Sequence, residues 1–234
     1  MWRFHGTAWA NPLTAQFIAL EGIDGSGKST MAERLYQAFR SAEVDTILTR
    51  EPGGTALGEQ IRSLLLRDES ASMLPQAETL LFAAARAQLV GEIVRPALER
   101  GTVVITDRFT DSSLAYQWGG RELNQDGVRS AQQLATTGLE PDVKILLDLP
   151  VEMALRRRMA GVGEVNRLDS EALEFHTRVR SAYHSLAKDD PPRWHIVDAA
   201  RSEDLVWFDV ARAAGLTSNW AGPLRQERNQ RVVQ

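Results

Sequence analysis

The chain has 234 residues, with 31 acidic and 27 basic side chains, a formal net charge of −4 and no cysteine. This length fits one α/β domain with a core of ordinary size, and the acidic balance argues against an extended nucleic-acid partner, so we expect a small ligand. The lack of cysteine excludes disulfides, thiolate metal sites and cysteine nucleophiles.

No stretch of the sequence is long and apolar enough to cross a bilayer, and residues 1–16 lack the continuous apolar segment of a signal peptide. We therefore expect a cytoplasmic protein with neither a membrane nor a nucleic-acid partner. Residues 1–16 are predicted to form a flexible N-terminal extension, residues 17–214 the folded domain, and residues 215–234 a flexible C-terminal tail.

A glycine-rich segment stands between an apolar run at residues 17–20 and a helical pattern that follows it. Gly22–Ser29 satisfies the pattern G-x-x-x-x-G-K-[ST]. In a strand–loop–helix context, backbone N–H groups of such a loop surround phosphate oxygens, Lys28 adds a positive charge, and the Ser29 hydroxyl reaches Mg²⁺. The sequence therefore predicts a phosphate site for a nucleotide.

Apolar runs that predict strands alternate with amphipathic segments that predict helices along the rest of the chain. The predicted strands are 17–20, 44–49, 102–106, 143–149 and 194–197. The predicted helices are 30–39, 56–66, 76–100, 112–117, 125–137, 151–159, 169–188 and 203–213. This alternation predicts a three-layer α/β sandwich, in which helices cover both faces of a parallel sheet.

The longest helical segment, 76–100, carries an internal proline and a terminal glycine. Its predicted packing positions are Leu80, Leu81, Ala84, Leu89 and Ile93. Pro96 is expected to bend or interrupt it, and Gly101 to end it. Asp169–Ser170 is expected to cap the helix that follows the glycines near residue 161.

Charged residues follow two of the predicted strands, at the edge where open α/β sheets bind ligands. Asp107 and Arg108 come after strand 102–106 and suit water-mediated Mg²⁺ binding and bidentate phosphate binding, with a surface ion pair after the strand as the less favoured alternative. Arg50 follows strand 44–49. No Asn-Lys-x-Asp guanine signature occurs, which counts against a GTPase switch.

Three motifs together resemble those of thymidylate kinases. They are the phosphate loop, the Arg-Glu-Pro-Gly-Gly-Thr of Arg50–Thr55, and Asp107–Phe109 with Ser113 and Ala115–Gln117 shortly after. The resemblance spans about residues 17–213. It implies Mg²⁺-dependent transfer of the ATP γ-phosphoryl group to dTMP, giving dTDP and ADP in dTTP biosynthesis. It also implies a five-stranded parallel sheet of the P-loop NTPase type and a homodimer formed through helices.

The resemblance further implies roles for single residues. The catalytic residues would be Lys28, Arg108, Arg167 and Arg158, and the metal ligands Ser29 and Asp107. The ATP-binding residues would be Gly22, Ile23, Asp24, Gly25, Ser26, Gly27, Lys28, Ser29, Thr30 and Ala200. The dTMP-binding residues would be Asp24, Arg50, Glu51, Pro52, Phe82, Arg86, Arg108, Ser113, Tyr116 and Gln117.

Recognition of the nucleoside is expected from four of these residues. Phe82 and Arg86 share a helical face, so that Phe82 can stack on thymine and Arg86 can donate to a base carbonyl. Taken alone, they would more often be a core residue and a solvated charge. Asp24 suits acceptance from the sugar 3′-OH, and Tyr116 suits exclusion of a 2′-OH, with packing under the loop as its alternative.

An arginine that covers the transferring phosphoryl group is expected in a lid of about residues 156–168. One subgroup of the family carries this arginine inside the phosphate loop, where the present chain has Gly25. The three arginines at 156–158 occupy consecutive helical positions and cannot all face the site. Arg167, beyond the lid glycines, is the first candidate and Arg158 the second.

Two other classes of protein remain as alternatives. A phosphate monoester is already ionised near neutral pH, so its phosphorylation needs alignment and charge neutralisation rather than a general base. Another nucleoside or nucleoside-monophosphate kinase is the first alternative, and a nucleoside kinase would need a carboxylate base such as Asp107. A P-loop nucleotide switch is the second, and turnover that is indifferent to dTMP would identify it.

Overall fold

The computed structural model describes residues 15–67, 72–160 and 171–216. Most of the predicted N-terminal extension, of the predicted lid, including Arg167, and of the predicted tail lies outside these residues. Within the described part, no helix is both long enough and apolar enough to traverse a bilayer.

A five-stranded sheet, parallel throughout, forms the centre of the molecule, in the order β2-β3-β1-β4-β5. The strands are β1 Phe17–Glu21, β2 Thr46–Arg50, β3 Val103–Asp107, β4 Val143–Asp148 and β5 Trp194–Asp198. The helices are α1 Lys28–Ser41, α2 Ala56–Leu66, α3 Pro75–Leu89, α4 Arg95–Glu99, α5 Thr110–Ser113, α6 Gln125–Thr136, α7 Val151–Ala160, α8 Leu173–Asp189 and α9 Glu203–Ala213. Two π-helical turns are η2 Val90–Val94 and η3 Leu114–Gly120.

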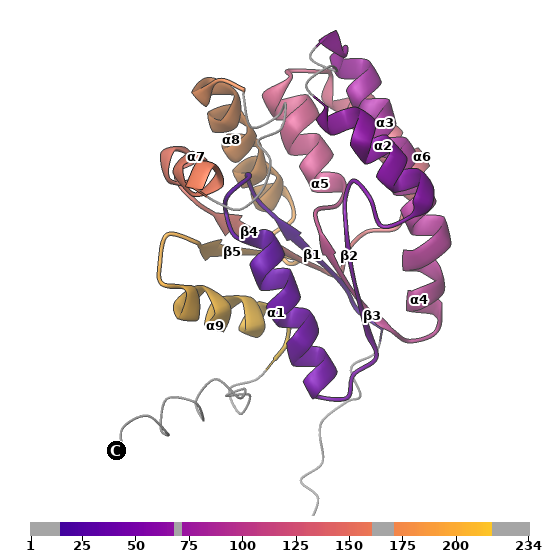
Figure 1. Cartoon of the computed structure of the whole chain (residues 1–234), viewed down its shortest axis with the longest axis vertical. Coiled ribbons are helices and arrows are strands. Elements are labelled where there is room, and N and C mark those ends of the chain that lie inside the picture. Colours follow the sequence, from indigo (N-terminus) through magenta and orange to yellow (C-terminus); the bar gives the residue numbers. More distant parts are fainter. Residues whose placement is uncertain (1–14, 68–71, 161–170, 217–234) are drawn as a thin grey trace, which may run out of the picture.

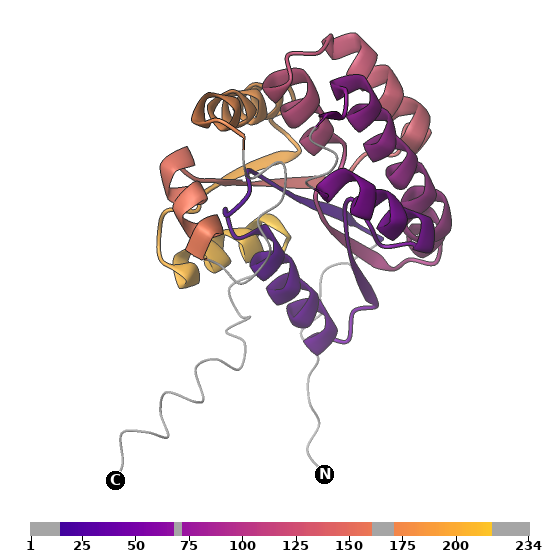
Figure 2. The same cartoon turned by 45° about the horizontal axis from the view of Figure 1, so that its top comes forward.

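Helices cover both faces of the sheet, as Figures 1 and 2 show. Successive side chains of a strand point to opposite faces. Ile18 and Leu20 of β1 pack in the cluster that contains α1 residues, and α9 lies beside α1. Phe17 and Ala19 pack with Leu89 of the α3–η2–α4 run. The predicted three-layer α/β architecture with a parallel sheet is confirmed.

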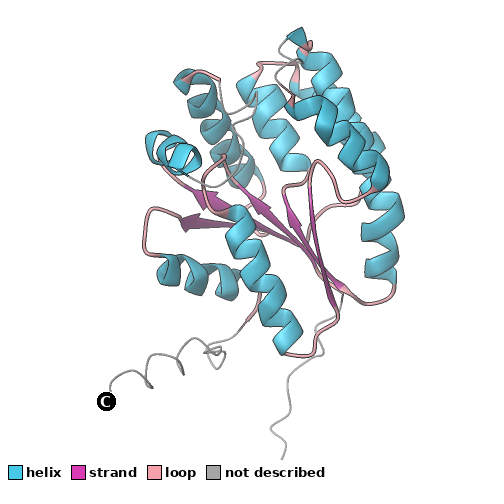
Figure 3. Cartoon of the chain, in the orientation of Figure 1, coloured by secondary structure: helices cyan, strands magenta, loops and turns pink. Residues whose placement is uncertain are grey.

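The predicted 76–100 helix runs without a gap from α3 through the π-helical turn η2 to α4, all of it within the helices coloured cyan in Figure 3. The π-helical turn η2 is the predicted interruption, and it lies just before Pro96 rather than at it. Pro96 has no N–H to donate to the carbonyl one turn back, so the backbone hydrogen bonds of the preceding turn must be rearranged. Gly101 follows α4 with φ of +85°, as a helix stop requires.

Two of the predicted packing positions in this segment are wrong. Leu80 is 62% exposed and Ala84 is also exposed, whereas Leu89 is buried as predicted. The inner face of α3 instead buries Glu78 and Arg86, because both side chains are satisfied by partners in the interior. Apolar periodicity therefore misplaced Leu80 and Ala84, whereas Leu81 and Ile93 are half-buried against the core.

Several predicted boundaries also move. Strand β2 begins at Thr46 rather than at residue 44, and the predicted 112–117 helix begins earlier, at Thr110, and continues as η3. Helix α8 begins at Leu173 with Ala172 as its N-cap, without a side-chain cap. The predicted cap at 169–170 lies outside the described residues. Helices α2 and α9 have the predicted bounds.

Candidate active site

The phosphate loop connects β1 to α1 at the carboxyl edge of the sheet. Lys28 opens α1 and is only 6% exposed, and its Nζ donates to the Ile23 carbonyl oxygen at 2.9 Å. Burial and the positive charge of Arg108 lower the pKa of Lys28 to about 8. The first N–H groups of a helix lack intrahelical partners, so this ammonium stands beside free donors suited to an anion.

Gly25 is required by the close approach of α7. Its φ is +80°, and a Cβ atom at this position would lie 2.1 Å from the Ala154 carbonyl oxygen and 3.2 Å from the Arg158 amide nitrogen. No side chain fits there, which explains physically why the loop cannot carry an arginine of its own. The same contact brings the half-buried Arg158 to the phosphate loop.

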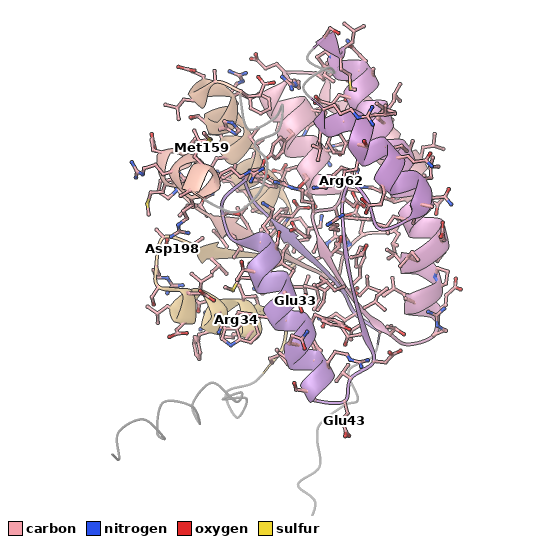
Figure 4. The ribbon with its side chains drawn as sticks, viewed as in Figure 1. Glu33, Arg34, Glu43, Arg62, Met159 and Asp198 are labelled. Carbon is pink, nitrogen blue, oxygen red and sulfur yellow. The ribbon has the colours of Figure 1, made fainter. Side chains whose placement is uncertain are left out.

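The neighbouring arginines of α7 point elsewhere. Arg156 and Arg157 are exposed, and Arg157 Nη1 donates to the Ala199 carbonyl oxygen at 3.0 Å, in the loop that follows β5. The predicted ATP-binding Ala200 is exposed in this loop, and its N–H donates to the carboxylate of Asp198 at 3.0 Å. Figure 4 shows Asp198 near the α7 side of the molecule. The resemblance to an adenine-binding loop remains a prediction.

Ser29 and Asp107 meet across the loop. Ser29 Oγ donates to Asp107 Oδ2 at 2.5 Å, and the other carboxylate oxygen, Oδ1, is buried without a hydrogen-bond partner in the described residues. A hydroxyl beside a carboxylate whose second oxygen makes no hydrogen bond offers oxygen ligands of the kind that Mg²⁺ prefers. The residues at these two positions therefore fit the predicted metal site.

All of the predicted dTMP-binding residues except Arg50 line one pocket beside the loop. Asp24 comes from the loop, Pro52 from the segment after β2, Phe82 from α3, and Gln117 from η3. Four separate segments thus converge, as the sheet topology requires at its carboxyl edge. Arg50 instead makes an exposed ion pair with Glu59 at 3.2 Å.

Asp24 and Arg108 join the pocket to the phosphate loop. Arg108 Nη2 donates to Asp24 Oδ1 at 2.7 Å, and the Tyr116 hydroxyl donates to Asp24 Oδ2 at 2.8 Å. Burial alone would raise the pKa of Asp24, but Arg108 and Lys28 hold it well below its usual range. Asp24 is therefore an ionised hydrogen-bond acceptor at the mouth of the pocket.

The Arg86 guanidinium is 1% exposed and bound on every nitrogen. Its Nε donates to Glu51 Oε2 at 2.7 Å, and its Nη2 donates to the Phe109 carbonyl oxygen at 2.9 Å and pairs with Glu51. Its Nη1 donates to Ser113 Oγ at 3.0 Å and to Gln132 Oε1. A donor for a base carbonyl is therefore available from Arg86 only if one of these contacts is exchanged.

The sequence analysis missed three residues that line the pocket, namely Arg62, Leu66 and Ser112. Arg62 and Leu66, four residues apart on α2, both line the pocket, and Arg62 Nη1 donates to the Pro52 carbonyl oxygen at 2.9 Å. Figure 4 shows Arg62 above the carboxyl ends of the strands. The i, i+4 spacing of Arg62 and Leu66 on the helix that follows the predicted dTMP-binding residues 50–52 was the available signal.

Glu21 was missed too, although it supports Arg108 through the residues around it. This side chain at the end of β1 is fully buried, and it accepts from the Phe109 N–H at 2.9 Å, from Ser112 Oγ at 2.6 Å and from the Tyr183 hydroxyl at 3.0 Å. Arg108 has a left-handed φ of +76°, which these contacts on the next residues help to hold. Burial, followed by the nearby Asp111 carboxylate, raises the pKa of Glu21 to about 7.

Glu21→Gln is expected to change how stability depends on pH. Between the ordinary pKa of 4.5 and the folded value of about 7, the folded chain keeps a proton that the unfolded chain has released. The contribution of Glu21 to stability is therefore fully present below pH 4.5 and is lost as pH rises through 7. Urea unfolding at pH 5 and pH 8 should show the variant gaining stability relative to wild type at pH 8.

The exposed Glu33→Gln provides the matched control, and Figure 4 shows Glu33 on the outer face of α1. We expect this variant to follow the wild-type stability profile. An identical profile for wild type and Glu21→Gln would mean that Glu21 is ionised throughout this range, against the effect of its burial.

Comparison with known proteins agrees with this geometry. The family model described as "Thymidylate kinase" matches residues 20–209. A thymidylate kinase of Thermomicrobium roseum is 50% identical over 198 residues, covering 83% of this chain and 93% of that protein. One of Desulfovibrio desulfuricans is 50% identical over 197 residues, covering 81% and 91%. The predicted resemblance is confirmed, and the chain belongs to the thymidylate kinase family.

Proposed function

We propose that the chain transfers the γ-phosphoryl group of ATP to dTMP in the pocket beside the phosphate loop, giving dTDP and ADP. One observation carries the proposal. The pocket that gathers Phe82, Ser113 and Gln117 is also lined by Asp24 and Arg108, whose charges act on Lys28 of the phosphate loop, so an acceptor phosphate bound there would lie close to a donor phosphate. Asp107, which a nucleoside kinase would need as a base, does not line this pocket.

Each residue near the reacting phosphates then acts by charge or position. The dTMP phosphate is already an ionised nucleophile, so the site supplies alignment and neutralisation. Lys28 and Arg108 neutralise the negative charge of the phosphoryl group in the transition state. Arg62 adds a third cation at the wall of the pocket, and Asp24 with Tyr116 would contact the sugar.

Mg²⁺ would be held by Ser29 directly and by Asp107, directly or through water. When bound, the ion would neutralise β- and γ-phosphate oxygens and help to orient them. The buried Asp107 oxygen without a hydrogen-bond partner supports this assignment. The Ser29 hydroxyl, now directed to Asp107, would turn its lone pair to the metal.

A coupled assay of ADP release tests the proposed reaction. We expect turnover with ATP and dTMP, and only background turnover when dTMP is omitted. Omission of Mg²⁺ should also stop the reaction. ADP release at the same rate with and without dTMP would instead indicate a P-loop switch or a plain ATPase.

We also infer a homodimer formed through α2, α3 and α6. These helices lie together on one side of the molecule (Figures 1 and 2), and they expose Leu57 and Leu64 from α2, Leu80 from α3, and Leu134 from α6. Leu80 and Leu134 are 62% and 82% exposed. A surface with several large apolar side chains is typical of a protein–protein interface.

The double variant Leu80→Glu/Leu134→Glu is expected to be monomeric, because it would place carboxylates in the interface. Sedimentation equilibrium over a range of protein concentrations measures this. Leu205→Glu, on α9 across the molecule and 51% exposed in the wild type, is the matched control and should leave the dimer intact. A wild-type chain that sediments as a monomer at all concentrations would refute the proposed dimer.

A further inference from the structure

The pocket has a phosphate end and a base end, if the proposed function holds. Asp24 and Arg108 mark the phosphate end, because they adjoin the loop that holds ATP. Phe82 of α3 and Gln117 of η3 line the same pocket from two other elements. A pyrimidine seated on Phe82 therefore lies within reach of the Gln117 amide.

The orientation of the Gln117 amide is fixed by a residue outside the pocket. Gln117 is 1% exposed, and its Nε2 donates to Glu78 Oε1 at 2.9 Å. An ionised carboxylate only accepts hydrogen bonds, so the reversed amide would set two oxygens against each other. Gln117 must keep its nitrogen on Glu78 and present its carbonyl oxygen elsewhere.

Glu78 is itself held in its charged form. It is 1% exposed, and the Arg121 guanidinium donates to both of its oxygens, at 3.3 Å from Nε and 3.2 Å from Nη2. Arg121 Nη1 pairs in turn with Glu171 at 2.6 Å. A bidentate arginine favours the carboxylate and leaves Glu78 no freedom to rotate away from Gln117.

The Gln117 carbonyl oxygen has no partner among the described residues, while the Arg86 donors are all engaged. The group that the pocket offers to a base edge without rearrangement is therefore an acceptor. Thymine and uracil carry a donor, N3–H, where cytosine carries an acceptor nitrogen. A fixed acceptor binds the first two and repels the third.

We propose that Glu78 is a specificity-determining positioning residue. By holding the Gln117 amide in one orientation, it presents a carbonyl oxygen to N3–H of the bound pyrimidine and so selects thymidine or uridine monophosphates over cytidine monophosphates. Glu78 does not touch the substrate. It acts through Gln117, and Arg121 acts through Glu78.

Glu78→Gln tests this role with little change of shape. The new amide can donate as well as accept, so Gln117 becomes free to reverse. With ATP saturating, kcat and KM are measured for dTMP, dUMP and dCMP. We expect the ratio of kcat/KM for dTMP over dCMP to fall about tenfold or more, mostly through KM. The ratio for dTMP over dUMP should stay the same, because both bases carry N3–H.

Two further variants isolate the coupling. Gln117→Met removes the acceptor and should lower the dTMP-over-dCMP ratio at least as much, and adding Glu78→Gln to it should lower the ratio no further. Glu171→Gln, which removes a partner of Arg121 that does not touch Gln117, should leave the ratio unchanged. If Glu78→Gln does not fold, Glu78→Met/Arg121→Met removes both charges of the pair and carries the same test.

The outcomes separate this inference from the proposed function. Wild-type turnover that does not depend on dTMP would overturn the proposed function, and with it any selectivity. Selective wild-type turnover combined with an unchanged dTMP-over-dCMP ratio in Glu78→Gln would overturn the role of Glu78 alone. Equal loss of activity on all three substrates would mean that Glu78 is only a structural residue and would also overturn the inference.

Discussion

Lys28→Ala is expected to lower kcat by about 10³-fold or more, the range seen when a positioned charge is removed from a transition state. Lys28 is a buried cation beside the loop carbonyl of Ile23, and in its proposed role its loss removes a positive charge from the developing charge of the phosphoryl group. Single-turnover phosphoryl transfer at saturating ATP and dTMP measures the effect.

The fold should survive this substitution, because Lys28 contributes one hydrogen bond to the loop and α1 keeps its apolar contacts through Leu35 and Phe39. Circular dichroism and thermal unfolding check this point. A folded Lys28→Ala protein with near-normal kcat would show that the ammonium is not the group that neutralises the phosphates.

Arg167→Ala is expected to lower kcat by about 10³-fold or more, with little change in dTMP binding measured without ATP. Gly25 cannot carry a side chain beside Ala154, so the covering arginine must come from elsewhere, and we propose Arg167 in the predicted lid. Arg167→Lys should recover little activity, since a point charge does not reproduce the planar fork of a guanidinium.

Arg158→Ala and the exposed Arg156→Ala are the matched comparisons. Arg158 adjoins Gly25 through its backbone, which makes it the second candidate. Arg156→Ala should leave kcat unchanged. A kcat within a few-fold of wild type for Arg167→Ala, together with a collapse for Arg158→Ala, would move the role from the lid to the end of α7.

The phosphate loop and the strand ends were predictable because their signals are local. The spacing from Gly22 to Ser29 specifies a backbone shape by itself, and the rule that ligands bind at the carboxyl edge of a parallel sheet brought Asp107 and Arg108 to the loop. The resemblance to thymidylate kinases, rather than this rule, named nine residues that line one pocket, although they come from four segments of the chain.

The buried acids could not be predicted in this way. Glu21 and Glu78 look like ordinary solvated glutamates in a short window, and their burial depends on partners far along the chain, such as Tyr183 for the first and Gln117 for the second. The misassigned Leu80 has the same origin, because α3 turns its polar residues inward and an apolar one outward. Apolar periodicity does not identify a helix face that is buried for its hydrogen bonds.

Transfer of label from ATP shows directly whether the chain phosphorylates dTMP. Incubation with ATP labelled on its γ-phosphate, dTMP and Mg²⁺, followed by chromatography of the nucleotides, shows where the phosphoryl group goes. We expect the label to appear in dTDP in step with ADP formation, with little released as inorganic phosphate. Label recovered as inorganic phosphate at a rate independent of dTMP would contradict it.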